Sequence, residues 1–241
     1  MGRRRLQVPN RGLCVATLAA VLLCLPPAAA RGFDLSVGIK GGLDFPFYTG
    51  PGYVDFLYVN DLSPSAAVRL GGGLFLTLGL VDFLALQPEI FYSSLGGASG
   101  SLDTLLWTDK APTLDAQLLI KLRFQLRGFN RFELFFGPQG VLNLGKVSRR
   151  LEDYWWIYAT DTWPDTYIEP LTLGAVAGIG WTLVRGANLF TIDVRYCHGL
   201  TSRMTAASGW ADWYQSNVKL MLGFGRQLAG RRMQGRPGRV R

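Results

Sequence analysis

Eight stretches of this chain alternate apolar and polar residues, and many of the polar positions are charged. The clearest stretch runs from Leu114 to Arg127. Its even-numbered residues are all apolar, and its odd-numbered residues are charged or carry an amide, except Leu119. Successive side chains of a β-strand point to opposite faces, so each stretch predicts a strand with one apolar face and one polar face. The class of protein depends on which of the two faces is turned inward.

The connections between these stretches alternate in length. The predicted strands are 33–42, 66–78, 84–94, 114–127, 131–143, 170–183, 189–199 and 213–225. The links 79–83, 128–130 and 184–188 are short, whereas the links 43–65, 95–113, 144–169 and 200–212 are long. Strict alternation of short turns and long loops is typical of an up-and-down barrel that crosses an outer membrane. An even number of strands places both chain ends on the periplasmic side.

Two observations indicate that the apolar faces point outward. The polar faces are rich in glycine as well as charge, which suits the crowded interior of a narrow barrel. The apolar faces end in aromatic residues, with Tyr92, Tyr196, Trp213 and Tyr214 toward the long loops and Phe124, Phe132, Phe190 and Phe224 toward the turns. Two aromatic girdles around an aliphatic belt are typical of a lipid-facing surface. A soluble lipocalin-like barrel is the alternative, but it would leave both girdles in water.

The fold class predicted is therefore all-β, an eight-stranded antiparallel up-and-down transmembrane β-barrel. Lipid cannot hydrogen-bond exposed backbone groups, so strand 33–42 must pair with strand 213–225 to close the wall. We expect the barrel to span residues 31–225.

The two ends of the chain are basic. Residues 1–30 combine Arg3, Arg4 and Arg5, a short apolar run and an Ala28–Ala30 cleavage site, which predicts a signal peptide. Residues 226–241 contain six arginines and no acidic residue, and we expect a disordered tail. The 15 basic and 17 acidic residues between these ends nearly balance, so the net charge of +8 is no evidence for nucleic-acid binding.

Charged side chains on the polar faces should meet inside the barrel. The predicted interior charge network comprises Lys40, Arg69, Glu89, Lys121, Arg123, Arg131, Glu133, Asp193, Arg195 and Lys219. We expect Arg195 to pair with Asp193 or Glu133 and Lys121 to pair with Glu89, since an unpaired buried charge costs several kcal/mol. Asp115 and Arg127 are expected nearer the rims. The network is either a structural polar core or the lining of a narrow ion-conducting path.

Several motifs, in order, resemble those of a known family. They are Gly38–Gly42, Gln87–Ser93, Leu134–Pro138, Gly174–Gly180 and Arg195–Leu200. This set resembles the outer-membrane β-barrel domain family of Bacteroidota and related diderm bacteria, which includes the PorT-like proteins and shares the small OmpA/OmpX type of barrel. The resemblance covers residues 33–225 and implies an outer-membrane barrel. The family has no shared catalytic residues to carry over, and strand 114–127 lacks the family's usual Ile-Pro.

Few residues are candidates for chemistry. His198 is the single histidine, and with Ser202 it could form part of a lipid hydrolase site, but a rim position in the headgroup zone fits it better. Cys197 is the only cysteine after the predicted signal peptide, and its parity places it in the interior as a packing residue. No metal-ligand spacing and no phosphate-binding loop is present, so we expect no cofactor.

Loop 144–169 is the best candidate for a binding surface. It places aromatic residues beside acidic ones, and aromatic anchors dominate binding energy at interfaces. The candidate residues are Tyr154, Trp155, Trp156, Tyr158, Trp163 and Tyr167. They either bind an extracellular protein or glycan, or pack over the barrel mouth.

The sequence thus predicts a monomeric, non-enzymatic protein of the cell outer membrane with a structural or surface-interaction role. Its expected partners are outer-membrane lipid and the barrel-assembly machinery. A narrow porin or transport-associated channel is the main alternative, and a lipid-modifying enzyme is a more distant one.

Overall fold

The computed structural model of the chain describes residues 34–59, 64–65, 67–95, 98–102, 105–126, 128, 130–153, 157–162, 167–208 and 212–229. The predicted signal peptide, residues 1–30, lies outside these ranges.

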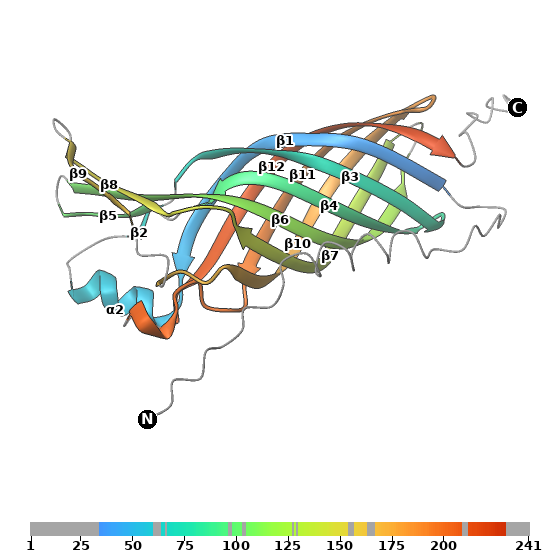
Figure 1. Cartoon of the computed structure of the whole chain (residues 1–241). Helices are drawn as coiled ribbons and strands as arrows, with labels where there is room; N and C mark the ends of the chain where they lie inside the picture. Colours follow the sequence, from blue (N-terminus) through green and yellow to red (C-terminus); the bar gives the residue numbers. More distant parts are fainter. Residues whose placement is uncertain are drawn as a thin grey trace, which may run out of the picture. The chain divides into compact units, whose positions relative to one another are not determined.

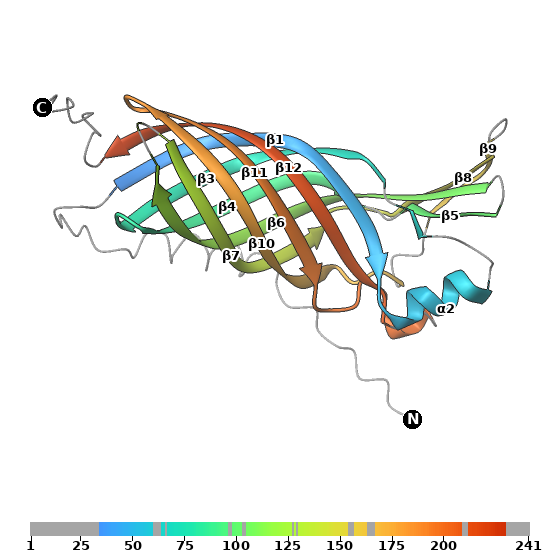
Figure 2. The same ribbon diagram turned by 180° about the vertical axis from the view of Figure 1, so that it is seen from behind.

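Eight long strands form a closed antiparallel barrel (Figures 1 and 2), as the alternation predicts. The strands are β1 (Asp34–Thr49), β3 (Arg69–Val81), β4 (Leu84–Leu95), β6 (Leu105–Gln125), β7 (Asn130–Asn143), β10 (Leu171–Arg185), β11 (Asn188–Gly199) and β12 (Tyr214–Ala229). Each strand pairs with the next barrel strand along the chain. The pairing of β1 with β12, from Leu35 opposite Ala229 to Thr49 opposite Tyr214, closes the wall.

Short turns join the strands at one end of the barrel, which we call the turn end. Gly128 and Gly186 have φ angles of 74° and 61° there, and no atom lies within 4 Å of a Cβ added at either position. These glycines supply the left-handed backbone that a tight hairpin needs. The opposite end carries the long connections, and we call it the loop end.

Three strands extend well beyond their predicted ranges. β1 continues to Thr49 because its alternation continues through Asp44, Pro46 and Tyr48, which are all buried. β6 begins at Leu105 rather than near Leu114. β12 continues to Ala229, so residues 226–229 of the predicted disordered tail belong to a strand paired with β1, and that boundary of the prediction was wrong. Residues 230–241 lie outside the described ranges.

The predicted long loops contain regular structure. β2 (Pro64–Ser65), β5 (Ala98–Leu102), β8 (Ser148–Asp153) and β9 (Ile157–Thr162) assemble with residues 105–113 of β6 into a small sheet in the order β2-β5-β6-β8-β9. We call this sheet the arm, and it projects from the loop end (Figure 1). The prediction of plain loops was wrong here because these short strands are stabilised by pairing with β6 rather than by alternation of their own.

In the part of the chain that the structure describes, two short helices lie at the loop end. They are α2 (Pro51–Val59) and the 3₁₀ helix η2 (Ala206–Ser208). Among the described residues, no helix is long and apolar enough to cross a membrane.

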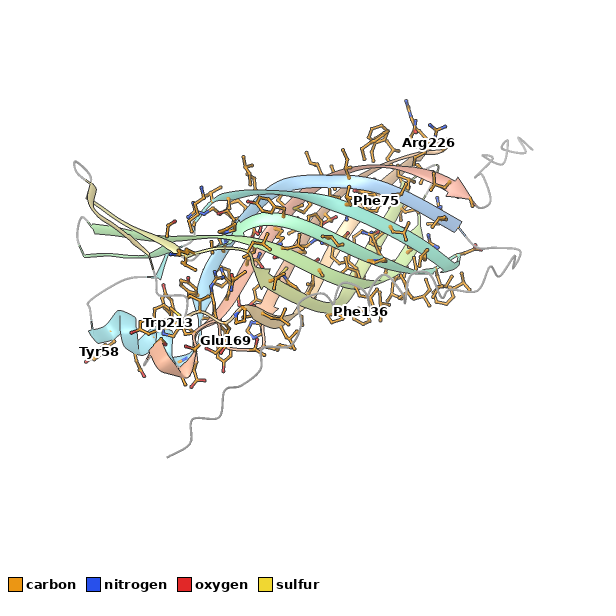
Figure 3. All side chains as sticks on the ribbon, in the orientation of Figure 1. Tyr58, Phe75, Phe136, Glu169, Trp213 and Arg226 are labelled. Atoms are coloured by element: carbon orange, nitrogen blue, oxygen red, sulfur yellow. The ribbon has the colours of Figure 1, made fainter. Side chains whose placement is uncertain are left out.

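The two faces of the barrel wall differ in chemistry. Large apolar side chains point outward from every strand, and Leu70 is 76% exposed. The inward positions are mostly polar, and the buried set includes Lys40, Glu89, Asp193 and Arg195. Figure 3 shows side chains along both faces of the wall. The barrel is therefore built with a polar core and an apolar surface.

Candidate functional site

The centre of the barrel holds two cations and two carboxylates in mutual contact. The Lys40 ammonium lies 2.8 Å from Glu89 Oε1 and 2.7 Å from Asp193 Oδ2. The Arg195 guanidinium donates to Asp193 Oδ1 at 2.6 Å and to both Glu89 Oε2 and Gln117 Oε1. All four charged side chains are almost completely buried. These charges neutralise one another, which is how an ionic cluster can be tolerated away from water.

Neighbouring strands make room for this cluster with glycine. Lys40 on β1 faces Gly223 of β12, and a Cβ added at Gly223 would lie 2.8 Å from Lys40 Cγ. A side chain at position 223 would therefore displace the lysine stem. The inward glycines predicted from the alternation serve this purpose.

A second group of ion pairs lies toward the turn end. The Lys121 ammonium donates to Glu133 Oε2 at 2.5 Å, and Arg123 Nη1 donates to Asp34 Oδ2 at 2.9 Å. The predicted pair of Lys121 with Glu89 does not form. The register places Lys121 opposite Ala85 on β4, whereas Glu89 lies opposite Gln117, so the shear of the wall separates the two residues along the axis.

The third group lies toward the loop end. Lys219 donates to Asp115 Oδ2 at 2.6 Å and lies 3.5 Å from Asp44 Oδ2. Asn217 donates to Asp44 Oδ1 at 2.7 Å, and Gln139 donates to Asp115 Oδ2 at 3.3 Å. Asp115, expected nearer a rim, lies in this group toward the loop end and is fully buried. β6 continues past Asp115 into the arm.

Two predicted members lie at the margins of the network. Arg69 is half-buried and donates to the Val68 carbonyl at 3.4 Å. Arg131 is half-buried at the turn end, where its Nε donates to Gln125 Oε1 at 3.3 Å. Arg127 lies outside the described residues.

Three inward phenylalanines separate the ionic groups. Lys40 lies over the Phe75 ring, Lys121 lies over the Phe135 ring, and Arg195 lies between the Phe91 and Phe135 rings, at 5.2 to 5.6 Å from the ring centroids. Such contacts add cation–π attraction to the ion pairs. A Cβ at Gly178 would lie 2.5 Å from the Phe135 ring, so this ring needs a glycine on the adjacent strand.

An aromatic cluster lies at the loop end of the barrel. Tyr48 from β1, Tyr53 from α2 and Trp213 before β12 are buried, and their ring centroids lie 5.2 to 5.5 Å apart. Figure 3 shows Trp213 at the α2 end of the barrel and Arg226 at the opposite end. We call these three residues the mouth cluster. It attaches α2 to the barrel.

The candidates for catalysis do not assemble into a site. His198 points outward and is exposed, with Nδ1 3.1 Å from the Tyr196 hydroxyl and 3.2 Å from Ser216 Oγ. Ser202 instead donates to the Met204 carbonyl at 3.0 Å. In the described part of the chain, no carboxylate hydrogen-bonds to His198, so the third member of a hydrolase triad is missing there.

Cys197 and the acidic groups show no sign of metal binding. Cys197 is a free thiol buried against Leu119, Phe135 and Val176. Across the described ranges, no group of three or more His, Cys, Asp or Glu side chains is placed to hold a metal ion.

Of the six aromatic residues predicted as a binding surface, the described ranges include Tyr158 and Tyr167. Tyr154, Trp155, Trp156 and Trp163 lie outside the described residues. Tyr158 belongs to β9 of the arm. The Tyr167 carbonyl accepts a hydrogen bond from the Thr205 backbone at 3.0 Å, beside the connection that precedes β12.

Sequence reasoning missed several residues of the interior. Asp34, Asp44, Gln117 and Asn217 all contribute to the three ionic groups. The alternation places Asp34, Gln117 and Asn217 on the inward faces, but the predicted network did not include them, and Asp44 lies in the stretch 43–65 that was predicted as a loop. Arg203, in the connection between β11 and β12, is buried as well, and no periodic signal marks it.

Together these features define a closed eight-stranded antiparallel β-barrel with an ion-paired interior and an apolar exterior. Three similar solved structures are outer membrane protein OprG from Pseudomonas aeruginosa, the attachment invasion locus protein Ail of Yersinia pestis, and neisserial surface protein A. OprG is 11% identical (TM-score 0.45, covering 83% of this chain and 98% of its own). Ail is 12% identical (TM-score 0.40, covering 82% of this chain and 99% of its own). The neisserial protein is 10% identical (TM-score 0.41, covering 81% of this chain and 99% of its own).

These values concern the fold alone and carry no argument about function. No protein-family model and no curated protein matches the chain, so the resemblance to the PorT-like proteins stays a prediction.

Proposed function

We propose that this chain is an outer-membrane β-barrel protein of a diderm bacterium, non-enzymatic, which acts at the cell surface through its arm. The observation that carries the membrane assignment is the belt of exposed apolar side chains around the whole wall, including Ile39, Leu74, Ile192 and Leu222. Such a continuous belt far exceeds the apolar patches of a soluble monomer. In lipid the same belt is the stabilising surface.

Aromatic pairs at both edges of the belt support this placement. Phe124 packs on Phe132 and Phe190 packs on Phe224 toward the turn end, with centroid separations of 6.3 Å and 5.2 Å. Phe47 stacks on Tyr196 toward the loop end at 6.5 Å. Aromatic side chains prefer the membrane interfaces. Outer-membrane lipid and the barrel-assembly machinery are the partners that such a barrel requires, and a closed wall has no free edge through which it must associate.

The filled interior favours a barrel that does not conduct. Three groups of paired charges and three phenyl rings lie inside the barrel. In planar bilayers, the refolded protein should therefore give no stable conductance steps. Regular ohmic steps from the wild-type chain would instead favour the alternative of a narrow porin or transport-associated channel.

The arm is the part of the molecule best suited to contact a partner. β6 runs without a break from the barrel wall into the arm, so the barrel and the arm share one strand. Among the described residues, β9 pairs with β8 only, so its other edge presents unpaired backbone groups. We propose that loop 144–169 binds an extracellular protein or glycan. The free edge favours a protein, because an extended peptide can add to it as a further strand.

A pair of proline substitutions on β9 tests this proposal. Ladder hydrogen bonds alternate between the two edges of a strand, so Ala159→Pro and Thr160→Pro remove N–H groups that point to opposite edges. One of the two prolines replaces an N–H group that points away from β8, toward the free edge. That variant should abolish adhesion of cells displaying the protein, measured by autoaggregation and surface retention. Each variant must keep the gel migration of the folded barrel. Wild-type adhesion in both variants would rule out binding through this edge.

A further inference from the structure

Arg203 differs from the other fully buried cations of the barrel. It is 2% exposed, and its side chain makes one hydrogen bond, from Nη2 to Asn143 Oδ1 at 3.3 Å. Its Nε is buried without a partner. No carboxylate of the described residues lies within 4.0 Å of it, although the backbone of Glu169 donates to its carbonyl.

The cations of the three ionic groups, unlike Arg203, are all paired with carboxylates. Each interior cation of the three ionic groups has a carboxylate within 4.0 Å, namely Lys40, Lys121, Arg123, Arg195 and Lys219. Taking a guanidinium out of water without an opposite charge costs several kcal/mol. The chain has met this requirement everywhere else in the buried interior, so an uncompensated Arg203 calls for an external anion.

A small pocket adjoins the Arg203 side chain at the loop end. Its lining includes Arg203, Gln139, Thr172, Gly174, Gln215 and Asn217. Both polar atoms of the Gln215 amide are buried and unpartnered, as is Arg203 Nε. Two residues on different segments thus line one cavity, and each has a buried N–H donor without a hydrogen-bond partner. Its volume of about 20 Å³ admits a single small group and not a whole sugar or nucleotide.

We propose that this pocket binds one oxyanion group, a carboxylate or a phosphate oxygen, with Arg203 as its charge partner and Gln215 as a further donor. Guanidinium and amide N–H groups are suited to such oxygens. The group can belong to a free small anion or to the charged headgroup of an outer-leaflet glycolipid, since the pocket lies at the loop end of the barrel.

Unfolding of the refolded full chain in urea tests the proposal, with formate as the small oxyanion. Tosylate at equal ionic strength is the reference, because it is too large for the cavity. Formate should raise the wild-type midpoint, and above its dissociation constant the free energy of unfolding should rise with the logarithm of the formate concentration. At a formate concentration 100 times its dissociation constant, the ratio of folded to unfolded protein should rise about 100-fold.

Two arginine variants separate binding from packing. Arg203→Met should abolish the formate effect and, in tosylate, should be at least as stable as the wild type, because it removes an unpaired buried charge. Arg226→Met, on an exposed arginine, should keep the full formate effect. Equal destabilisation of Arg203→Met in both salts would overturn the proposal, since it would assign the arginine a packing role alone.

A second experiment, with lipid in place of formate, identifies the source of the oxyanion. The same unfolding is measured with an intact phosphorylated lipid A and with its dephosphorylated form in otherwise identical micelles. Stabilisation by formate supports a free anion, and stabilisation that needs the lipid phosphate and Arg203 supports a headgroup. The absence of an Arg203-dependent effect with either ligand would refute the site.

Discussion

At the scale of single residues, the barrel is held together by charges that share partners. Lys40 and Arg195 both contact Glu89 and Asp193, so each carboxylate is compensated twice. The Gln87 amide also donates to Glu89, and Thr77 donates to Gln87 at 2.8 Å. Hydrogen bonds of this kind use the remaining lone pairs of the carboxylates, which offsets part of the cost of removing the charges from water.

Removing one member should therefore cost more than removing a balanced pair. Arg195→Met leaves Glu89 and Asp193 to share Lys40, and we expect a loss of about 3–5 kcal/mol in the free energy of unfolding. The double variant Arg195→Met, Glu89→Gln should recover part of that loss. Urea unfolding in lipid vesicles, followed by tryptophan fluorescence, measures both values.

The exposed Arg226 supplies the matched control for these two variants. Arg226→Met should change the unfolding free energy by less than about 1 kcal/mol. A single variant no more destabilised than this control would show that the central ion pairs contribute little.

Parity in the sequence could identify which residues enter the interior, but not which of them pair. The inward positions of Lys40, Lys121 and Arg195 follow from alternation within one strand. The pairing of Lys121 with Glu133 rather than Glu89 depends on the register between strands, which local alternation does not contain. Arg203 lies in a connection with no period at all, so nothing in the sequence marks it as buried.

At the scale of elements, the loop end is more structured than its sequence indicates. Tyr53 of α2 packs against Tyr48 of β1 and against Trp213, which immediately precedes β12. The isolated nine-residue segment of α2 is too short to be stable as a helix in water, so this packing must stabilise it. Tertiary contacts of this kind are the reason that the sequence failed to predict α2 and the arm.

Truncating Tyr53 should release α2 without unfolding the barrel. Loss of a buried aromatic side chain costs about 3 kcal/mol, which corresponds to roughly 100-fold more frequent local opening. Tyr53→Ala should be cleaved by proteinase K within residues 50–66 at a correspondingly higher rate. Tyr58 lies on the same helix and is 88% exposed, so Tyr58→Ala should be cleaved at the wild-type rate. Equal rates in both variants would contradict an anchoring role for the mouth cluster.

At the scale of the whole molecule, the barrel inverts the arrangement of a soluble protein. Its charges are paired inside, and its aliphatic and aromatic side chains point outward. The fold class, the strand number and the facing of the strands could all be predicted from the sequence, because period, loop length and girdles are local patterns. The sheet of the arm could not, because it is created by the continuation of β6 beyond the wall.

The central claim is that this outward apolar surface is a lipid-facing one. Gel migration of the refolded protein, compared with and without boiling, tests it most directly. We predict a folded band of altered mobility that forms only with detergent or lipid vesicles and converts to the unfolded position on boiling. A monomeric folded protein that forms in buffer without either would contradict the claim, because it would show that water tolerates the belt.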